Sequence, residues 1–451
     1  MSSTLIMINL LVTIALVIFL ILKVKLNPVI SLVLGSLYMG IASKVGLTQT
    51  VTAITGGFGS LMTGIGLSVG FGVMLGQLVA DCGGVQSIAN AILKMFSKDK
   101  AHYAMGSTGF IVSIPVFYDV GYVILVPIAR ALGKAGKGLP YFVGALVAGL
   151  GIAHTFIPPT PGPLTGAQLL GIDLGTTILW GTVVGLPTFL IALWAYGKFF
   201  LENPKFWNKD VDEDPNFSER DTVQKAKDAT VVSEGKLPSF GGAMLPILVP
   251  IVLILMGTAT KAVTGSTPDI IAFFSDKSIA MLLGVFTAIL VARSTMSMEQ
   301  IQKSINKSLN DAGVVLLITG AGGALGNVLT ASGVGNAISE LMAHVSIHPI
   351  LLAWLIASLI KIAQGSGTVA MITAISILAP SVPSLGVAPI LIALAAFSGT
   401  LCGGHLNDSG FWVTAKIAGL TTSGGLKTYT LVCALLSVIS LVFIFLLSLV
   451  L

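Results

Sequence analysis

Long apolar runs, separated by short polar breaks, extend along almost the whole chain and constrain its fold more than any other feature. The first run extends from Leu5 to Leu22. A helix needs roughly 20 mostly apolar residues to cross a hydrocarbon core about 30 Å thick. Charged residues make up only 10% of the chain, whereas soluble domains carry about a quarter. We therefore predict an all-α polytopic membrane protein rather than a membrane barrel, whose short alternating segments are missing from the sequence.

A polar segment interrupts the apolar chain near its middle. Residues 201–240 contain almost no apolar run. Their charged residues include Asp210, Asp212, Glu213, Arg220, Lys225 and Asp228. We interpret the segment as a solvated cytoplasmic linker between an N-terminal transmembrane repeat, residues 1–200, and a C-terminal inverted transmembrane repeat, residues 241–451.

The two halves share a spacing of small and apolar residues. The pattern Gly70, Gly72, Leu75, Gly76, Gly83 and Ile88 returns as Gly320, Gly322, Leu325, Gly326, Gly333 and Ile338. We assign these glycines to close helix packing rather than to a nucleotide-binding loop, because no strand precedes them. Later features also follow in the same order in both halves, which favours two repeats.

Each half next contains an apolar stretch that is too long for one membrane span and too short for two. These stretches are residues 101–132 and 350–380. Non-helical backbone is tolerated at membrane depth only where protein or a water-filled cavity satisfies its polar groups. We predict two re-entrant helical hairpins, with tips at residues 113–119 and 364–368.

A second interrupted stretch follows each predicted hairpin. Residues 139–169 contain a break at residues 151–163, where prolines forbid a continuous helix. Residues 387–420 contain a polar break at residues 403–410. We predict two broken helices whose half-helix ends point to a site near the membrane mid-plane, as in carriers built from inverted repeats.

The predicted topology gives each half about five transmembrane helices, one re-entrant hairpin and one broken helix. An odd number of spans inverts the second half relative to the first. With the N-terminus outside, most Lys and Arg residues then lie inside, as the positive-inside rule requires. Only Lys44, Lys261 and Lys277 lie clearly outside. The net charge of +5 is explained in this way, and nucleic acid is not expected as a partner.

Polar residues gather in the four interruptions, and ionisable groups at membrane depth are functional candidates by default. The predicted substrate-binding residues are Ser113, Tyr118, Asp119, His154, Thr155, Thr160, Lys361, Gln364, Ser366, Thr368, His405, Asn407, Asp408 and Ser409. Together with free N–H groups at half-helix N-termini, they would bind a carboxylate and its hydroxyl groups. Two alternatives are that individual hydroxyls donate to carbonyls of their own helices and that Lys361 extends to the outer surface.

Two carboxylates are candidates for coupling transport to protons. Desolvation raises the pKa of a carboxyl group, so that a buried one can exchange protons near neutral pH. We predict that Asp119 or Asp408 has this role, with Asp119 slightly favoured. No metal site and no cofactor are expected, because His, Cys and carboxylates show no ligand spacing.

The motifs in the interruptions resemble those of the gluconate permease (GntP) family of bacterial carriers. They are Phe117-Tyr-Asp119, His154-Thr-Phe-Ile-Pro-Pro-Thr-Pro-Gly-Pro163, Gln364-Gly-Ser-Gly-Thr368 and His405-Leu-Asn-Asp-Ser-Gly-Phe-Trp412. The resemblance covers nearly the whole chain and implies proton symport of gluconate or related sugar acids across the bacterial inner membrane. It also implies an ion-transporter-type fold, and members of that wider group often form homodimers. Gluconate carriers often have His where this chain has Thr160, a departure that concerns the substrate.

We therefore expect a secondary carrier, not an enzyme, that imports gluconate or a related small hydroxy-carboxylate with protons. Its partners would be this organic anion, protons and the lipid bilayer. Two alternatives within the same architecture are a sodium-coupled carboxylate symporter and a permease for D-serine or another hydroxy acid. A channel or a non-transporting receptor fits less well, because four symmetric polar breaks suit an occluded site.

Overall fold

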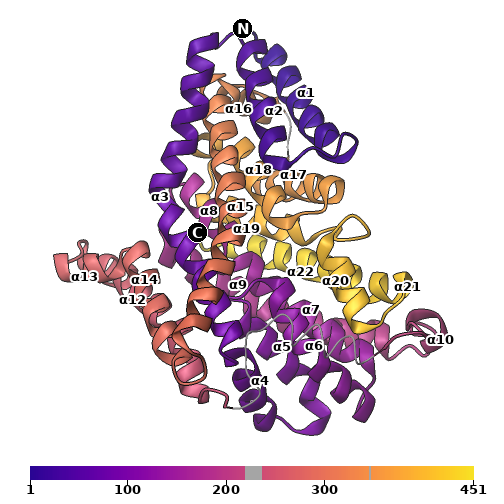
Figure 1. Cartoon of the computed structure of the whole chain (residues 1–451). Coiled ribbons are helices and arrows are strands. Elements are labelled where there is room, and N and C mark those ends of the chain that lie inside the picture. Colours follow the sequence, from indigo (N-terminus) through magenta and orange to yellow (C-terminus); the bar gives the residue numbers. More distant parts are fainter. Residues whose placement is uncertain (219–235, 345–346) are drawn as a thin grey trace.

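The computed structural model describes residues 1–218, 236–344 and 347–451, which form an elongated helical molecule (Figure 1). The N-terminal half contains α1 (Ser3–Leu22), α2 (Pro28–Ala42), α3 (Leu47–Asp81), α4 (Gly84–Met95), α5 (Ala101–Val112), α6 (Tyr118–Ala135), α7 (Leu139–Phe156), α8 (Pro161–Leu169) and α9 (Leu174–Ala195). A short helix, α10 (Lys209–Asp212), begins the linker.

The C-terminal half follows the same order. It contains α12 (Phe240–Thr264), α13 (Asp269–Ser275), α14 (Lys277–Ala292), α15 (Met298–Ala331), α16 (Val334–His344), α17 (Pro349–Gln364), α18 (Gly367–Leu378), α19 (Pro389–Leu401), α20 (Ser409–Ala418), α21 (Thr422–Gly425) and α22 (Leu431–Leu447). No strand occurs in the described residues, so the predicted all-α class is confirmed.

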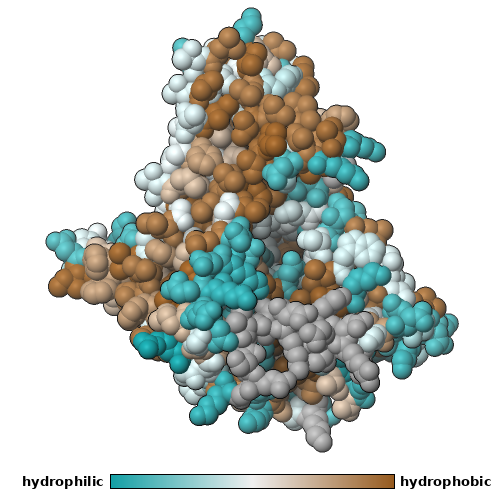
Figure 2. Space-filling view, in the orientation of Figure 1, coloured by the Kyte–Doolittle hydropathy of each residue, from teal (hydrophilic) through white to brown (hydrophobic). Residues whose placement is uncertain are grey.

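Within the described residues, seven helical segments are long and apolar enough to cross a membrane, or eight if the bent pair α13 and α14 forms one span. Four further apolar helices, α2, α17, α18 and α19, are shorter. Large apolar side chains are exposed on α1, α9, α12 and α22, and Figure 2 shows hydrophobic surface over the end that carries α1 and α2. These faces suit contact with lipid. The count of about five spans per half remains a prediction.

Equivalent helix ends in the two halves are separated by the same number of residues as the repeated glycine pattern. The long helices α3 and α15 end at Asp81 and Ala331, and the next helices begin at Gly84 and Val334. In Figure 1, α4, α5 and α6 lie at one end of the molecule, whereas α16, α17 and α18 lie toward the other. This arrangement supports two repeats, and their inverted orientation in the membrane remains a prediction.

The chain is interrupted at all four predicted places. α5 ends before the tip that leads to α6, and α17 ends at Gln364 before α18 begins at Gly367. The other two breaks separate α7 from α8 and α19 from α20. α7 and α19 are buried along almost their whole length, and α5 and α17 pack against them. Polar interruptions thus lie inside the protein, where other elements can satisfy their backbone groups.

The first part of the linker is folded against the C-terminal half. Asp212 is fully buried and accepts hydrogen bonds from Lys427 Nζ at 2.7 Å, Ser423 Oγ at 2.6 Å and the Asn208 N–H at 2.8 Å. Burial by itself raises the pKa of Asp212, but these donors outweigh it and hold the pKa below its usual value. The linker is therefore anchored here, and its predicted remainder at residues 219–235 lies outside the described residues.

The closest approach of α3 and α15 depends on Gly57. A Cβ atom at this position would collide with the backbone oxygen of Gly323. We predict that Gly57→Ala lowers the melting temperature and the yield of folded protein, because a backbone oxygen cannot rotate away as a side chain can. Gly59→Ala is the matched control, since a Cβ there meets nothing within 4 Å. Fluorescence-detected size exclusion after heating measures both variants, and equal stability would contradict the packing.

The anchored linker should make stability depend on pH. Because its folded pKa is depressed, Asp212 contributes stability above the ordinary carboxyl pKa of about 3.9 and loses that contribution as the pH falls through the folded pKa. Asp212→Asn should therefore melt at a lower temperature than wild type at neutral pH, and the difference should shrink below about pH 4. Asp210→Asn, at an exposed neighbour, should behave like wild type. A difference that is independent of pH would refute the assignment.

Candidate functional site

One cavity of about 510 Å³ brings the four interruptions together. Its walls come from the N-terminal ends of α6, α8, α18 and α20, the C-terminal ends of α7 and α19, the middle of α15, and the turn that leads into α22. Segments that are more than 300 residues apart in the sequence, such as those of Phe117 and Cys433, thus face one space. A cavity of this size is large enough for a small organic molecule.

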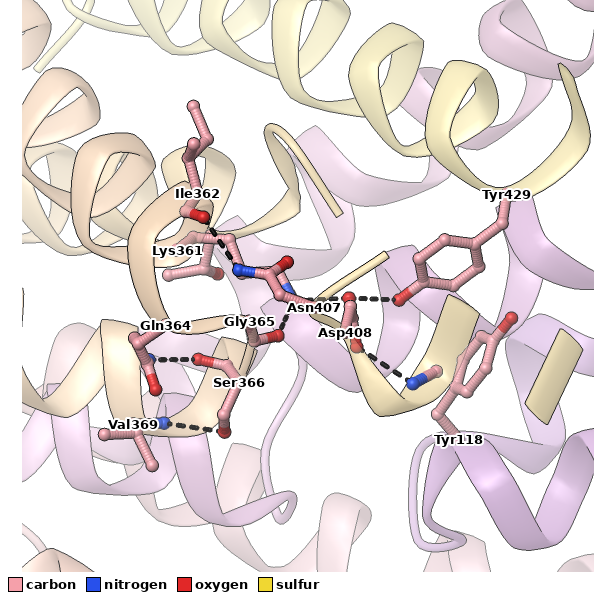
Figure 3. Close-up of polar contacts among 12 residues, drawn as sticks. Tyr118, Lys361, Ile362, Gln364, Gly365, Ser366, Val369, Asn407, Asp408 and Tyr429 are labelled. Carbon is pink, nitrogen blue, oxygen red and sulfur yellow. Dashed lines mark hydrogen bonds and ion pairs between the residues drawn. The ribbon is translucent and has the colours of Figure 1, made fainter. Parts of the chain in front are cut away.

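An ion pair between Lys361 and Asp408 lies at the wall formed by the C-terminal half (Figure 3). Lys361 Nζ lies 2.5 Å from Asp408 Oδ2, and the two side chains are 5% and 6% exposed. The same Nζ donates to the backbone oxygen of Gly365. Lys361 therefore ends inside the protein at the cavity and does not extend to the outer surface. An ammonium group has three N–H donors, so one remains for a ligand.

Asp408 is also held by groups other than Lys361. Tyr429 donates from its hydroxyl to Asp408 Oδ2 at 2.7 Å, and the Gly410 N–H donates to Asp408 Oδ1 at 2.9 Å. The second contact makes Asp408 the N-cap of α20. A carboxylate with three donors is firmly oriented, and its negative charge compensates the positive end of α20. The N-terminus of α20 is thus already occupied by a protein anion.

Among α6, α8, α18 and α20, whose N-terminal ends line the cavity, α18 has the N-terminus most available to a bound anion. Ser366 caps it by accepting the Val369 N–H at 3.4 Å, and Ser366, Gly367 and Thr368 line the cavity. α8 offers fewer donors, because Pro161 and Pro163 have no N–H. α6 carries the carboxylate of Asp119 in its own first turn. A bound anion is therefore best placed between α18 and Lys361.

Two carboxylates face the cavity without a hydrogen-bond partner in the described residues. Asp119 lies in the first turn of α6, and Asp311 lies in the middle of α15. Both side chains are exposed to the cavity side. Unlike Asp408, neither accepts a hydrogen bond from an ammonium group or a helix N–H within the described residues. They are the groups in this cavity that are free to bind a cation or a proton.

Nine of the predicted residues line the cavity. They are Tyr118, Asp119, His154, Thr155, Lys361, Ser366, Thr368, Asp408 and Ser409. Tyr118 hydrogen-bonds to Thr414 across the two halves at 2.7 Å. His154 Nδ1 is buried without a partner in the described part of the chain, and Thr155 and Ser409 have side chains available to a ligand. The structure brings these residues together, and their contact with substrate remains a prediction.

The other five predicted residues, Ser113, Thr160, Gln364, His405 and Asn407, do not line the cavity. Thr160 donates to the backbone oxygen of His154 at 2.8 Å, and Asn407 donates to that of Ile362 at 2.8 Å. Gln364 donates to the Ser366 oxygen at 2.6 Å, and Ser113 donates to the Val116 oxygen at 3.3 Å. These four side chains satisfy carbonyls that the interruptions leave free.

Sequence reasoning missed Asp311 and Tyr429. Both lie within continuous helical segments rather than in a break, so no local irregularity marks them. For Asp311 a signal was available, because a carboxylate near an apolar run is costly. Tyr429 is part of a π-helical turn, Leu426–Thr430, a feature often found at functional sites. Among the described residues, no group of three His, Cys, Asp or Glu could hold a metal ion.

The whole chain matches known permeases. The model of GntP family permeases matches residues 5–450. A gluconate permease of Pseudomonas aeruginosa is 35% identical over 451 residues, which cover 98% of this chain and 97% of the relative. A high-affinity gluconate transporter of Escherichia coli is 33% identical over 96% of this chain and 97% of its own length.

A solved structure shares the fold. MtrF of Neisseria gonorrhoeae, from a class of antimetabolite efflux pumps, superposes with a TM-score of 0.63 over 89% of this chain and 85% of its own, at 16% sequence identity. At this sequence identity the likeness shows a shared fold and carries no information on the transported substrate. The apolar helices and the bacterial relatives together make the protein a multi-pass transporter of the inner membrane. The chain belongs to the GntP permease family.

Proposed function

We propose that the protein imports gluconate or a closely related hydroxy-carboxylate together with protons. The observation that carries the proposal is the cavity of about 510 Å³, which we call the central cavity, in which one site for an anion lies near two carboxylates without a hydrogen-bond partner in the described residues. Gluconate permeases at 33% and 35% identity over nearly the full length support the substrate class.

The binding site for the substrate carboxylate is the space between Lys361 and the first turn of α18. The third N–H of Lys361 and the free amides of Gly367 and Thr368 are donors of the kind that carboxylates accept. The hydroxyl groups of a sugar acid would then meet His154 and Thr155 at the end of α7, and Ser409 at the start of α20. All of these residues line the cavity.

Thr160 bears on the choice of substrate. The family resemblance implies His at this position in gluconate carriers, but here the Thr160 side chain donates to two backbone oxygens, those of His154 and Ile157. It does not line the cavity. Thr160 therefore affects the conformation of the break between α7 and α8 and not a direct contact with the substrate. Gluconate remains the first candidate substrate.

The charges in the cavity supply a physical reason for coupling. Asp119, Asp311 and Asp408 carry three negative charges, and Lys361 carries the only positive charge among the residues that line the cavity. A bound carboxylate would add a further negative charge in a space screened from water, which is unfavourable. Uptake of a cation at Asp119 or Asp311 relieves this repulsion. We propose that this cation is a proton, which a single carboxylate can accept.

The substrate class is tested by thermal unfolding of the purified protein with gluconate, glycerate, lactate, 3-hydroxybutyrate and D-serine. We expect gluconate to raise the melting temperature most. A ligand present at 100 times its Kd stabilises the folded protein by about 2.7 kcal/mol. The double variant Lys361→Gln/Asp408→Asn should lose the shift. It removes both charges and so avoids an unpaired buried charge. If none of the acids shifts the melting temperature, the proposal that the substrate is a hydroxy-carboxylate is wrong.

Proton coupling is tested with Asp119→Asn in proteoliposomes. Wild type should accumulate gluconate against its gradient when the outside is acidic, whereas the variant should lose accumulation but keep gluconate exchange, because the amide cannot carry a proton. Asp99→Asn, at an exposed position before α5, is the matched control. Asp311→Asn is measured in parallel.

Uphill, pH-driven accumulation by both Asp119→Asn and Asp311→Asn would overturn the coupling role of these carboxylates. Accumulation that follows a sodium gradient and ignores a protonophore would favour the sodium-coupled alternative instead.

A further inference from the structure

A second cavity, of about 340 Å³, lies between the end of α8, the start of α9 and the arm formed by α12, α13 and α14. We call it the outer cavity. Its polar lining includes Gln168, Asp173, Thr258, Lys261, Asp276 and Lys277. The central cavity and the outer cavity lie near opposite ends of α8. Gly162 lines the first, whereas Leu164, Ala167 and Gln168 line the second, and the helix rises about 9 Å from Gly162 to Gln168.

The two carboxylates of the outer cavity are already compensated. Asp173 caps α9 by accepting the Thr176 N–H at 3.0 Å, and it also accepts the Thr258 hydroxyl at 2.6 Å. Asp276 caps α14 by accepting the N–H groups of Ser278 and Ile279. Helix N-termini neutralise much of the charge of such caps. The two carboxylates are therefore partly compensated by helix N–H groups, although both still attract the Lys277 ammonium group.

The two lysines, in contrast, have unused donors. Lys277 Nζ donates to Gln168 Oε1 at 2.6 Å, an uncharged acceptor, and an ammonium group has two further N–H donors. Lys261 is exposed and has no partner in the described residues. The cavity thus offers several N–H donors on two positive charges, and the Oδ1 atoms of Asp173 and Asp276 are already in use. This is the chemistry that binds an oxyanion.

A purely structural role explains these lysines poorly. Lys277 is the first residue of α14, where a positive charge is disfavoured by the helix dipole. Lysines on the outer side of a membrane protein also run against the positive-inside rule. Only three lie clearly outside in the predicted topology, and two of them line this one cavity. Lys44, the third, does not.

We propose that the outer cavity binds an oxyanion at Lys261 and Lys277, and that this anion is the carboxylate of the incoming substrate on its way to the central cavity. This rests on the proposed function. Ammonium groups beside the route to the central cavity would raise the local concentration of an anionic substrate and its rate of capture. The phosphate of a lipid headgroup shares the same chemistry, and the experiment separates the two sources.

The test uses the full-length protein in proteoliposomes of phosphatidylcholine alone and of phosphatidylcholine with phosphatidylglycerol, with labelled gluconate as the probe. We expect Lys261→Gln/Lys277→Gln to raise the KM for uptake at least about fivefold while kcat stays close to wild type, because capture is lost and the central site is intact. The charge-preserving Lys261→Arg/Lys277→Arg should restore most of the affinity. Lys44→Gln is the matched control and should resemble wild type.

The two membranes distinguish the sources of the oxyanion. A raised KM in both membranes identifies the substrate carboxylate. A change that occurs only with phosphatidylglycerol identifies a lipid phosphate and overturns the capture role, although the oxyanion site stands. Normal KM values for the double Gln variant in both membranes refute the site altogether. If wild type takes up no gluconate, it is the proposed function that fails, which is a separate result.

Discussion

The buried ion pair between Lys361 and Asp408 is the interaction on which the central cavity depends. Neither charge is tolerable alone at membrane depth, where an unpaired ion is strongly destabilising. Their contact joins the C-terminal end of α17 to the N-terminal end of α20. Gly365 and Asn407 approach so closely beside the pair that a Cβ on Gly365 would collide with the Asn407 oxygen. One wall of the cavity is thus fixed by charge and close backbone packing together.

The opposite wall is positioned by contacts of α6 with α20. Tyr118 and Tyr122 both hydrogen-bond to Thr414, through its hydroxyl and its backbone oxygen. Nearer the other end of α6, Arg130 donates to the Ala418 oxygen and lies over the ring of Phe217. The first part of the linker therefore packs where these two helices end. The relative positions of Asp119 and Asp408 depend on this helix pair, which joins the two halves.

Local signals predicted the interruptions but not everything that faces them. Prolines, glycines and polar residues inside apolar runs are irregularities that can be read from the sequence, and the four breaks occur where they were expected. Which way a side chain in a break points is decided by packing. Asn407 and Thr160 donate to carbonyls, whereas Ser409 and Thr155 line the cavity. Asp311 enters the cavity from an uninterrupted helix, so only the tertiary arrangement reveals it.

The two halves have similar interruptions but contribute different chemistry to the cavity. The second half supplies the donors, Lys361 and the amides of α18. The break of the first half is rich in proline and poor in N–H groups, and its hairpin supplies the carboxylate of Asp119. In the proposed function, an anion held by the second half faces a carboxylate held by the first, and protonation of Asp119 would lower the repulsion between them. Under that proposal, coupling follows from the asymmetry of the repeats. Their shared shape encloses the cavity, and their different polar groups would make occupancy by the anion and by the proton depend on each other.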